Sequence, residues 1–496
     1  MKVAFSLLLI FLVIQSRAQH QHDMARMPDS SMKKMTVKKP TTKKTPTKKN
    51  IKMNMGGNKR QVMNDTTKPD MKMNMSKNMP MDEMNDTMKH GMNMERMNMS
   101  HSFSRNLPMS RDGSGTSWMP DASPMYAYMI MKEKTMIMLH GNIFLRYTNQ
   151  DIFNKGSRGG SGFSAPNWFM GMLQKPVGKK GLVMTRVMIS LDPLTVGGHG
   201  YPLLFQSGET YKGAPLIDHQ HPHDLFSELG IGYTQELNKN SDVFGYIGYP
   251  GEPALGPPAF MHRISAMNNP DAPLGHHWQD ATHITFGVAS LGFRYKNLKI
   301  EGSAFKGREP NENRYNLDKI TINSYSYRIS VNPSAHWALQ FSQGFIKSPE
   351  LSEPGVDVVR TTASVLFSKK ISDNNQYDAA FVWGYNDKSD GHKEHSVLLE
   401  NNHRIKKNTL YSRYEFIQKS AEELNLESLF NDSEFNIHVI TAGYNHMIFA
   451  AQYFDFLGGL QGSINFPPRP LQNLYGKTPL AVEVYLQFKP KIQPHQ

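Results

Sequence analysis

The sequence contains no cysteine, and beyond its first residues it has no long apolar run. The absence of cysteine excludes a disulfide-stabilised scaffold and any metal site built on thiolates. After residue 18, no stretch approaches the roughly 18 uninterrupted apolar residues that predict a membrane-spanning helix. The 496-residue chain must therefore fold without disulfides and without a helical membrane domain.

The only apolar run, Phe5 to Ile14, lies at the N-terminus. The positively charged Lys2 precedes it, and Ser16-Arg17-Ala18 offers a small-residue cleavage site behind it. This order predicts a secretory signal peptide over residues 1–18. A run of about ten residues is too short to span a bilayer as a helix, so we expect the chain to be exported from the cytoplasm.

Positive charge is concentrated in residues 19–125. This segment holds 19 Lys and Arg against 10 Asp and Glu, a net of +9 out of the +13 of the whole chain. Most of the positive charge therefore lies outside the part of the chain that is expected to fold, and the chain is expected to be exported. For these two reasons we expect no nucleic acid partner. The segment has almost no Leu, Ile, Val or aromatic residues, and we predict that it is disordered.

The same segment is rich in methionine, with 21 of the 33 methionines of the chain. The dominant spacing is two, as in four copies of MNM, and not the three and four of a helical stripe. Thioether sulfur is a soft ligand that selects Cu(I) and, by the same logic, Ag(I). A low-complexity spacer, or a sink for oxidants, is the alternative. The predicted copper ligands are Met53, Met55, Met71, Met73, Met75, Met92, Met94, Met97 and Met99.

From residue 126 to 490, apolar and polar residues alternate with a period of two. In AVEVYLQF, for example, Val482, Val484 and Leu486 fall on one face and Glu483 and Gln487 on the other. About 14–16 segments of roughly ten residues follow this pattern, which is typical of a transmembrane β-barrel. We therefore predict an all-β fold, an antiparallel barrel whose backbone amides all pair internally in lipid. A soluble sandwich or propeller is the alternative, but its strands are usually shorter.

Methionine recurs in the first predicted strands of the barrel. Met138 shares a strand face with His140, and Met184 and Met188 flank Arg186. That face should point into the lumen, because an arginine facing lipid is costly. The thioethers form either a track for soft ions or ordinary packing, since methionine is a common gap-filler.

Two long connections, residues 192–224 and 250–282, interrupt the predicted strands. Loops of this length are uncommon and often functional. Both are rich in histidine, which suits copper and zinc alike, and carboxylates flank the histidines. The predicted metal ligands in and beside them are Asp218, His219, His221, His223, Asp224, His262, His276, His277 and His283.

Three of these histidines stand at alternate positions of the motif PLIDHQHPHDLF. Pro222 excludes a helix and favours an extended backbone, in which alternate side chains share one side. We therefore expect His219, His221 and His223 to project together and to bind an ion, alone or with the second loop. A hydrogen-bonded plug without an ion and a pH-sensitive gate are the alternatives.

A methionine-rich segment joined to a predicted outer-membrane barrel, with MKMNM at 71–75 and MNMERMNM at 92–99, resembles the copper resistance protein B family. That family of bacterial outer-membrane proteins combines a variable Met- and His-rich N-terminal region with a C-terminal β-barrel. It is associated with copper tolerance. The resemblance implies an outer-membrane protein that binds copper.

We therefore expect an outer-membrane barrel that binds and handles copper or silver ions, in sequestration or efflux, and not an enzyme. Its tail would lie in the periplasm and bind Cu(I), and the loop histidines would bind copper or zinc. Expected partners are membrane lipid, metal ions and periplasmic copper proteins. Two other functions stay open. One is a metalloenzyme built on the three motif histidines, with Asp224 or Glu228 as the base. The other is a general porin whose tail absorbs oxidants.

Overall fold

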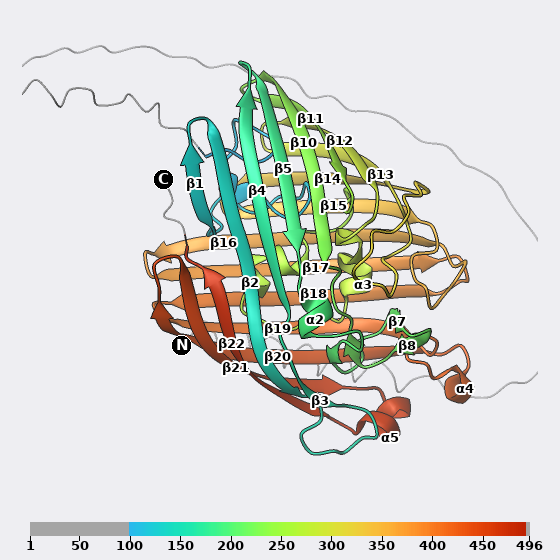
Figure 1. The fold of residues 1–496 in the computed structure, drawn as a ribbon. Coiled ribbons are helices and arrows are strands. Elements are labelled where there is room, and N and C mark those ends of the chain that lie inside the picture. The colour runs from blue at the N-terminus through green and yellow to red at the C-terminus, as the bar shows by residue number, and fades with distance from the viewer. Residues whose placement is uncertain (1–98, 493–496) are drawn as a thin grey trace, which may run out of the picture. The chain divides into compact units, whose positions relative to one another are not determined.

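A computed structural model describes residues 99–492, which form an all-β fold. Sixteen strands close into one antiparallel barrel (Figure 1). The barrel closes where β22 (Leu480–Pro490) pairs with β2 (Thr135–Asn149), from Ile143 opposite Phe488 to Asn149 opposite Val482. The predicted fold class is confirmed, and the strand number falls within the predicted range. The predicted signal peptide lies outside the described residues.

Each barrel strand pairs with the next along the chain, so the wall is a continuous meander. Between β2 and β22 its strands are β4 (Asn167–Val177), β5 (Gly181–Ile189), β10 (Phe226–Asn238), β11 (Ser241–Gly248), β12 (Val288–Tyr295), β13 (Leu298–Phe305), β14 (Ser324–Ser334), β15 (Trp337–Ile346), β16 (Val358–Ser372), β17 (Asn375–Lys388), β18 (Lys393–Ile405), β19 (Asn408–Ser420), β20 (Glu434–Ala450) and β21 (Phe454–Phe466).

Shorter elements lie at the edges and in the connections. Strands β1 (Tyr128–Lys132) and β3 (Ser161–Ser164) pair with the two ends of β2. Two small sheets join β6 (Tyr201–Pro202) to β9 (His219–Gln220) and β7 (Glu209–Tyr211) to β8 (Ala214–Leu216). The helices are η1 (Met109–Arg111), α2 (Asp192–Thr195), η2 (Phe260–His262), η3 (Ile264–Ala266), α3 (His276–Gln279), η4 (Ala281–His283), α4 (Glu427–Phe430), η5 (Arg469–Leu471) and α5 (Gln472–Tyr475). Within residues 99–492, none of these helices has the length and hydrophobicity needed to cross a bilayer.

The wall is apolar outside and charged inside. On β22, Val482 and Val484 are 41% and 54% exposed, whereas Glu483 and Gln487 are 1% and 0% exposed. An apolar outer face is what lipid requires of a barrel. The alternation predicted for this strand is confirmed, and it turns charged side chains into the lumen.

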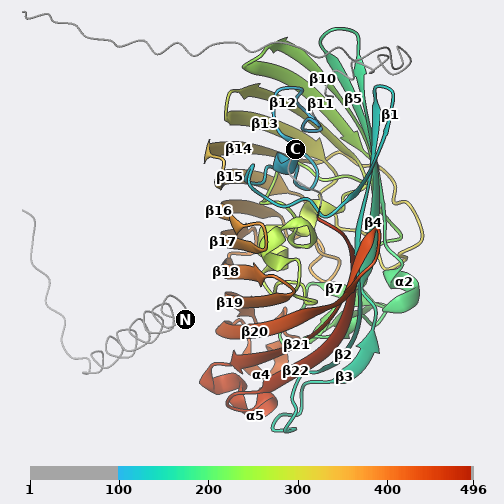
Figure 2. The same ribbon diagram turned by 90° about the vertical axis from the view of Figure 1, so that its left-hand side faces the viewer.

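Two segments fill much of the lumen. The connection between β11 and β12 runs inside the barrel, where its short helices lie between the walls (Figure 2). Arg263 in this connection is fully buried and lies 2.9 Å from both Asp280 of the same connection and Glu400 of β18. Residues 99–125 lie beside it, and Thr116 accepts a hydrogen bond from Arg328 of β14. Charged residues on the inner face of the wall are thus paired with residues of these two inner segments.

The prediction that residues 19–125 are disordered is wrong for residues 99–125, the part of this segment that the structure describes. Residues 99–125 are folded and mostly buried. Arg186 of β5 donates a hydrogen bond to the carbonyl of Gly115, and Ser114 Oγ accepts a hydrogen bond from the Ala259 amide. This segment orders through two kinds of contact: its polar groups bond to the wall, and its apolar residues are buried, with Phe103 and Met109 in an apolar cluster of the lumen. Composition averaged over residues 19–125 hides these few apolar residues.

Arg328 ties the wall to both inner segments, because it lies 2.9 Å from Glu301, 2.9 Å from Thr116 Oγ1 and 3.0 Å from the Gly256 carbonyl. The Arg328→Met variant removes a donor from all three buried groups, although Glu301 keeps its contact with Lys299 at 2.7 Å. Removing one partner of a buried ion pair typically costs about 3–5 kcal/mol. We expect the detergent-solubilised variant to lose its compact electrophoretic form at a clearly lower temperature. Lys347→Met is the matched control, because the Lys347–Asp357 pair is solvent-exposed. Equal melting of both variants would contradict this role.

Candidate metal centre

Five histidines from the two long connections meet around one cavity inside the protein. His221 and His223 come from the first connection, His276 and His277 from α3, and His283 from η4. The ring centroids of neighbouring members lie between 5.1 Å, for His276 and His283, and 6.4 Å, for His221 and His223. The chain therefore gathers imidazoles that are about 60 residues apart in sequence.

Three of these rings are held through one nitrogen. His223 Nδ1 lies 2.9 Å from Asp192 Oδ2, and His276 Nδ1 lies 2.6 Å from Asp280 Oδ1. His283 Nδ1 lies 2.8 Å from the Asp280 carbonyl oxygen. The buried Nε2 atoms of His223 and His283 have no hydrogen-bond partner among the described residues. Metal-binding histidines use this arrangement, in which Nδ1–H is donated to an oxygen and Nε2 keeps its lone pair for the ion.

Carboxylates surround the other two rings. His221 Nε2 lies 3.7 Å from Glu209, and His277 Nδ1 lies 3.5 Å from Glu309 and 3.7 Å from Glu350. Glu309 supplies negative charge next to the imidazoles, which favours a cation, whereas Glu209 is already paired at 2.9 Å with Arg314, which also lines the cavity. The cavity therefore offers both nitrogen and oxygen donors.

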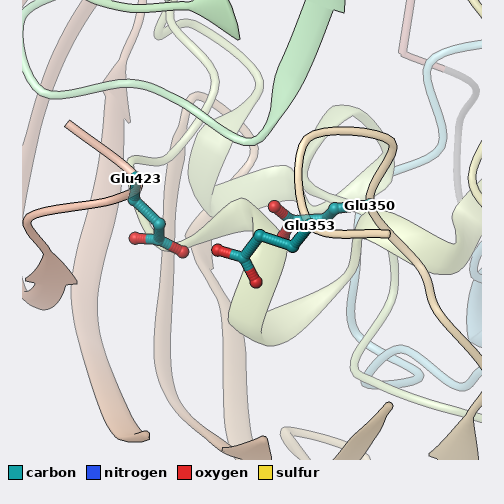
Figure 3. A group of neighbouring side chains, drawn as sticks. All are labelled: Glu350, Glu353 and Glu423. Atoms are coloured by element: carbon teal, nitrogen blue, oxygen red, sulfur yellow. The ribbon is translucent and has the colours of Figure 1, made fainter. Parts of the chain in front are cut away.

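The acidic surroundings continue beyond His277. Glu350, Glu353 and Glu423 bring carboxylate oxygens within 4.8 Å of one another (Figure 3). Lys388 Nζ lies 3.0 Å from Glu353 and 3.4 Å from Glu423, so this lysine already forms salt bridges with two of the three carboxylates. We regard it as the charged support of the histidine cluster and not as a separate metal site.

Burial lowers the pKa of the cluster histidines, because a charged imidazolium is poorly solvated there. The pKa of His221 falls well below its ordinary value, that of His276 is also lowered, and that of His283 falls to about 3. Neighbouring histidines add to the effect in all three. These rings are therefore neutral at physiological pH, the form in which imidazole binds a metal.

The cavity between the rings is small, with a volume of about 20 Å³. That volume holds about one water molecule or one ion. An organic substrate does not fit into it.

Two predicted ligands of the motif lie away from the cavity. His219 Nδ1 bonds to the Ile217 carbonyl oxygen at 3.0 Å, and His219 does not line the cavity. The prediction that His219 projects with His221 and His223 is wrong, because β9 ends at Gln220 and the alternation of an extended strand ends with it. Asp218 is buried and binds the Phe205 amide at 2.7 Å, which makes it a structural residue.

The remaining predicted ligands lie in different places. Asp224 lines the histidine cavity and lies 3.3 Å from Arg314. His262 lies elsewhere in the lumen, with its ring centroid 6.0 Å from that of His140. Met99 is half-buried and packs against an apolar cluster. Outside the described residues lie Met53, Met55, Met71, Met73, Met75, Met92, Met94 and Met97.

Sequence reasoning missed the residues that support the histidines: Asp192, Glu209, Glu309 and Glu350. Each is a single carboxylate. Glu309 and Glu350 belong to other connections, and no pattern in the sequence indicates that these connections lie next to the histidine loops. Only Asp192 carried a signal, because it opens the first histidine-rich connection.

No protein-family model matches the chain, and a search of curated proteins finds no match. Solved structures similar to it are outer-membrane proteins. An anion-selective porin from Comamonas acidovorans is 11% identical over 72% of this chain and 99% of its own, with a TM-score of 0.45. The Salmonella typhi OmpF complex with daunomycin is 8% identical over 73% and 100%, with a TM-score of 0.44. The outer membrane channel DcaP of Acinetobacter baumannii is 11% identical over 73% and 98%, with a TM-score of 0.39.

Proposed function

We propose that the protein is an outer-membrane barrel that binds a copper or zinc ion at the histidine cluster in its lumen and takes part in handling that metal. The observation that carries the proposal is the anchoring of three rings through Nδ1 around one small cavity, with His223 and His283 presenting an unpartnered Nε2. In this arrangement His223, His276 and His283 would hold the ion. His221 and the nearby carboxylates would complete its surroundings.

Copper and zinc are the favoured ions because imidazole binds both well, whereas calcium and magnesium prefer oxygen ligands. The site adds Asp192 and Asp280 as partners of the ligand rings, a feature that raises ligand basicity and fixes the tautomer. Copper handling by the methionine-rich residues before Met99 stays a prediction. If that prediction holds, the chain has thioether ligands for soft metals as well as a site of imidazole ligands.

A metalloenzyme fits the geometry less well. The cavity of about 20 Å³ leaves room for the ion and little else. Glu228, one of the two bases considered, does not line this cavity, and its carboxylate accepts a hydrogen bond from Tyr246 at 2.7 Å and lies 3.4 Å from Arg186. These contacts support binding of an ion over turnover of a substrate.

Removing a ligand ring should remove the ion. We expect His223→Ala and His283→Ala each to weaken Zn²⁺ binding by more than about a hundredfold, since the effect of a ligand should exceed that of an outer partner. Asp192→Asn, which alters the support of His223 and the acceptor of the Asn167 amide, should cost about tenfold to a hundredfold. Competition titration of the detergent-purified full chain measures these changes, and Zn²⁺ is the probe because thioethers bind it poorly.

His219→Ala is the matched control, because His219 belongs to the same motif and lies outside the cavity. Its Zn²⁺ affinity should equal that of the unaltered protein. If His223→Ala and His219→Ala bind Zn²⁺ alike, the histidine cluster is not the metal site.

Zn²⁺ affinity should also depend weakly on pH between 7.5 and 5.5. Two imidazoles of ordinary pKa near 6.5 would lose about a hundredfold in affinity at pH 5.5, because protons compete for the ring nitrogen. Burial lowers the pKa of His283 to about 3, so this ring stays neutral at pH 5.5, and the pKa of His276 is shifted in the same direction; the loss should therefore be smaller. Titrations at the two pH values measure this, and a hundredfold loss would mean that the rings are solvated.

A porin-type channel is the second candidate, and the sixteen-stranded barrel favours it. The two functions differ in what the lumen does. Because residues 99–125 and the connection between β11 and β12 occupy the lumen, we expect no steady open conductance in planar bilayers. Stable ohmic steps from the purified protein would favour the porin.

A further inference from the structure

A second cavity in the lumen is lined by sulfur. Its volume is about 60 Å³, three times that of the histidine cavity. Six of its lining residues are methionines, which come from the barrel wall and from the folded segment before β1: Met109, Met119, Met125, Met138, Met170 and Met172. Two histidines, His140 and His262, line the same space.

The strand register places these side chains side by side on the inner face of the wall. Met138 of β2 stands opposite Met172 of β4, and His140 stands opposite Met170. Directly opposed residues have Cβ atoms about 4.5–5.5 Å apart, within reach of long side chains. The wall thus forms a compact patch of three thioethers and one imidazole.

This patch belongs to a larger methionine cluster. Buried Met136, Met184, Met188 and Met261 pack with the same group, and Met99 and Met129 cover it in part. Packing alone explains such a cluster when the side chains fill the space between them, because methionine adapts to irregular gaps. Here they leave a cavity, and methionines form part of its lining; one of them, Met172, accepts a hydrogen bond from Ser102 Oγ at 3.1 Å.

His140 supplies a separate indication of a ligand. Its Nε2 atom is buried and has no hydrogen-bond partner among the described residues. Its ring packs edge-on against Trp168, with the centroids 4.7 Å apart, and Trp168 also contacts His262 at 4.7 Å. A buried ring nitrogen without a partner is costly unless something binds it.

Before any ion enters, the charged groups at and beside the cavity include two carboxylates and one arginine. Arg186 lines it and is paired with Glu228 at 3.4 Å. Asp112 lines it as well, and its carboxylate accepts hydrogen bonds from the Ser102 amide and hydroxyl. Asp112 can therefore offset one added positive charge, which favours a monovalent over a divalent cation.

We propose that this cavity binds one soft monovalent cation, Cu(I) or Ag(I), between the thioethers of Met138, Met170 and Met172 and the imidazole of His140. Thioether sulfur prefers these ions over zinc, magnesium and calcium. The site shares no residue with the histidine cluster. Met99, the first residue that the structure describes, packs against the same methionine cluster.

Trp168 makes the proposal testable in the full-length protein. A bound heavy ion next to an indole quenches its fluorescence, and ions held by methionines remote from Trp168 do not. We expect Ag(I), added to the detergent-purified protein, to quench tryptophan emission in a saturable way, and Zn²⁺ to leave it unchanged. The triple variant Met138→Leu/Met170→Leu/Met172→Leu should lose this quenching, as should Trp168→Phe.

Met184→Leu is the matched control, because Met184 is buried in the same cluster on β5 and does not line the cavity. It should be quenched like the unaltered protein. The compact electrophoretic form of each variant reports that the barrel is folded. Quenching of the folded triple variant at the same Ag(I) concentration, or no quenching of the unaltered protein, would overturn the site. Loss of Zn²⁺ binding in His223→Ala with Ag(I) quenching intact would separate this inference from the function proposed above.

Discussion

The pairing of charges inside the barrel is the constraint on which the rest of the structure depends. A wall that is apolar toward lipid must turn its polar residues inward, and charges buried there are costly without partners. Arg263 meets this need with Asp280 and Glu400, and Arg328 meets it with Glu301 and the inner segments. Because these contacts fix the connection between β11 and β12, they also fix the histidines that it carries.

The position of the candidate metal centre follows from the same network. Asp280 binds Arg263 through one carboxylate oxygen and His276 through the other, and its carbonyl oxygen lies 2.8 Å from His283 Nδ1. One residue thereby links the structural ion pairs to two of the candidate ligands. The ion pairs that hold the connection between β11 and β12 in the lumen also hold these histidines in place.

The barrel could be predicted from sequence because the period of two is local. Each strand shows it by itself, as Val482 to Gln487 do, and lipid leaves few other folds. The candidate site was predicted only in part. Its histidines stood out as a motif and as a second histidine-rich loop, and all five were predicted as ligands, within a longer group that also held residues lying elsewhere. Their carboxylate partners could not be found, because Glu309 and Glu350 reach His277 through tertiary contacts that no spacing encodes.

The enclosure of the histidine cavity has a kinetic consequence. Four of its five histidines are buried, so an ion bound as proposed would leave when the packed connections open locally. The lifetime of such a complex would be set by that opening as well as by the strength of the nitrogen–metal bonds. Loosening Asp280 from Arg263 would speed the exchange, because Asp280 holds two of the candidate ligands.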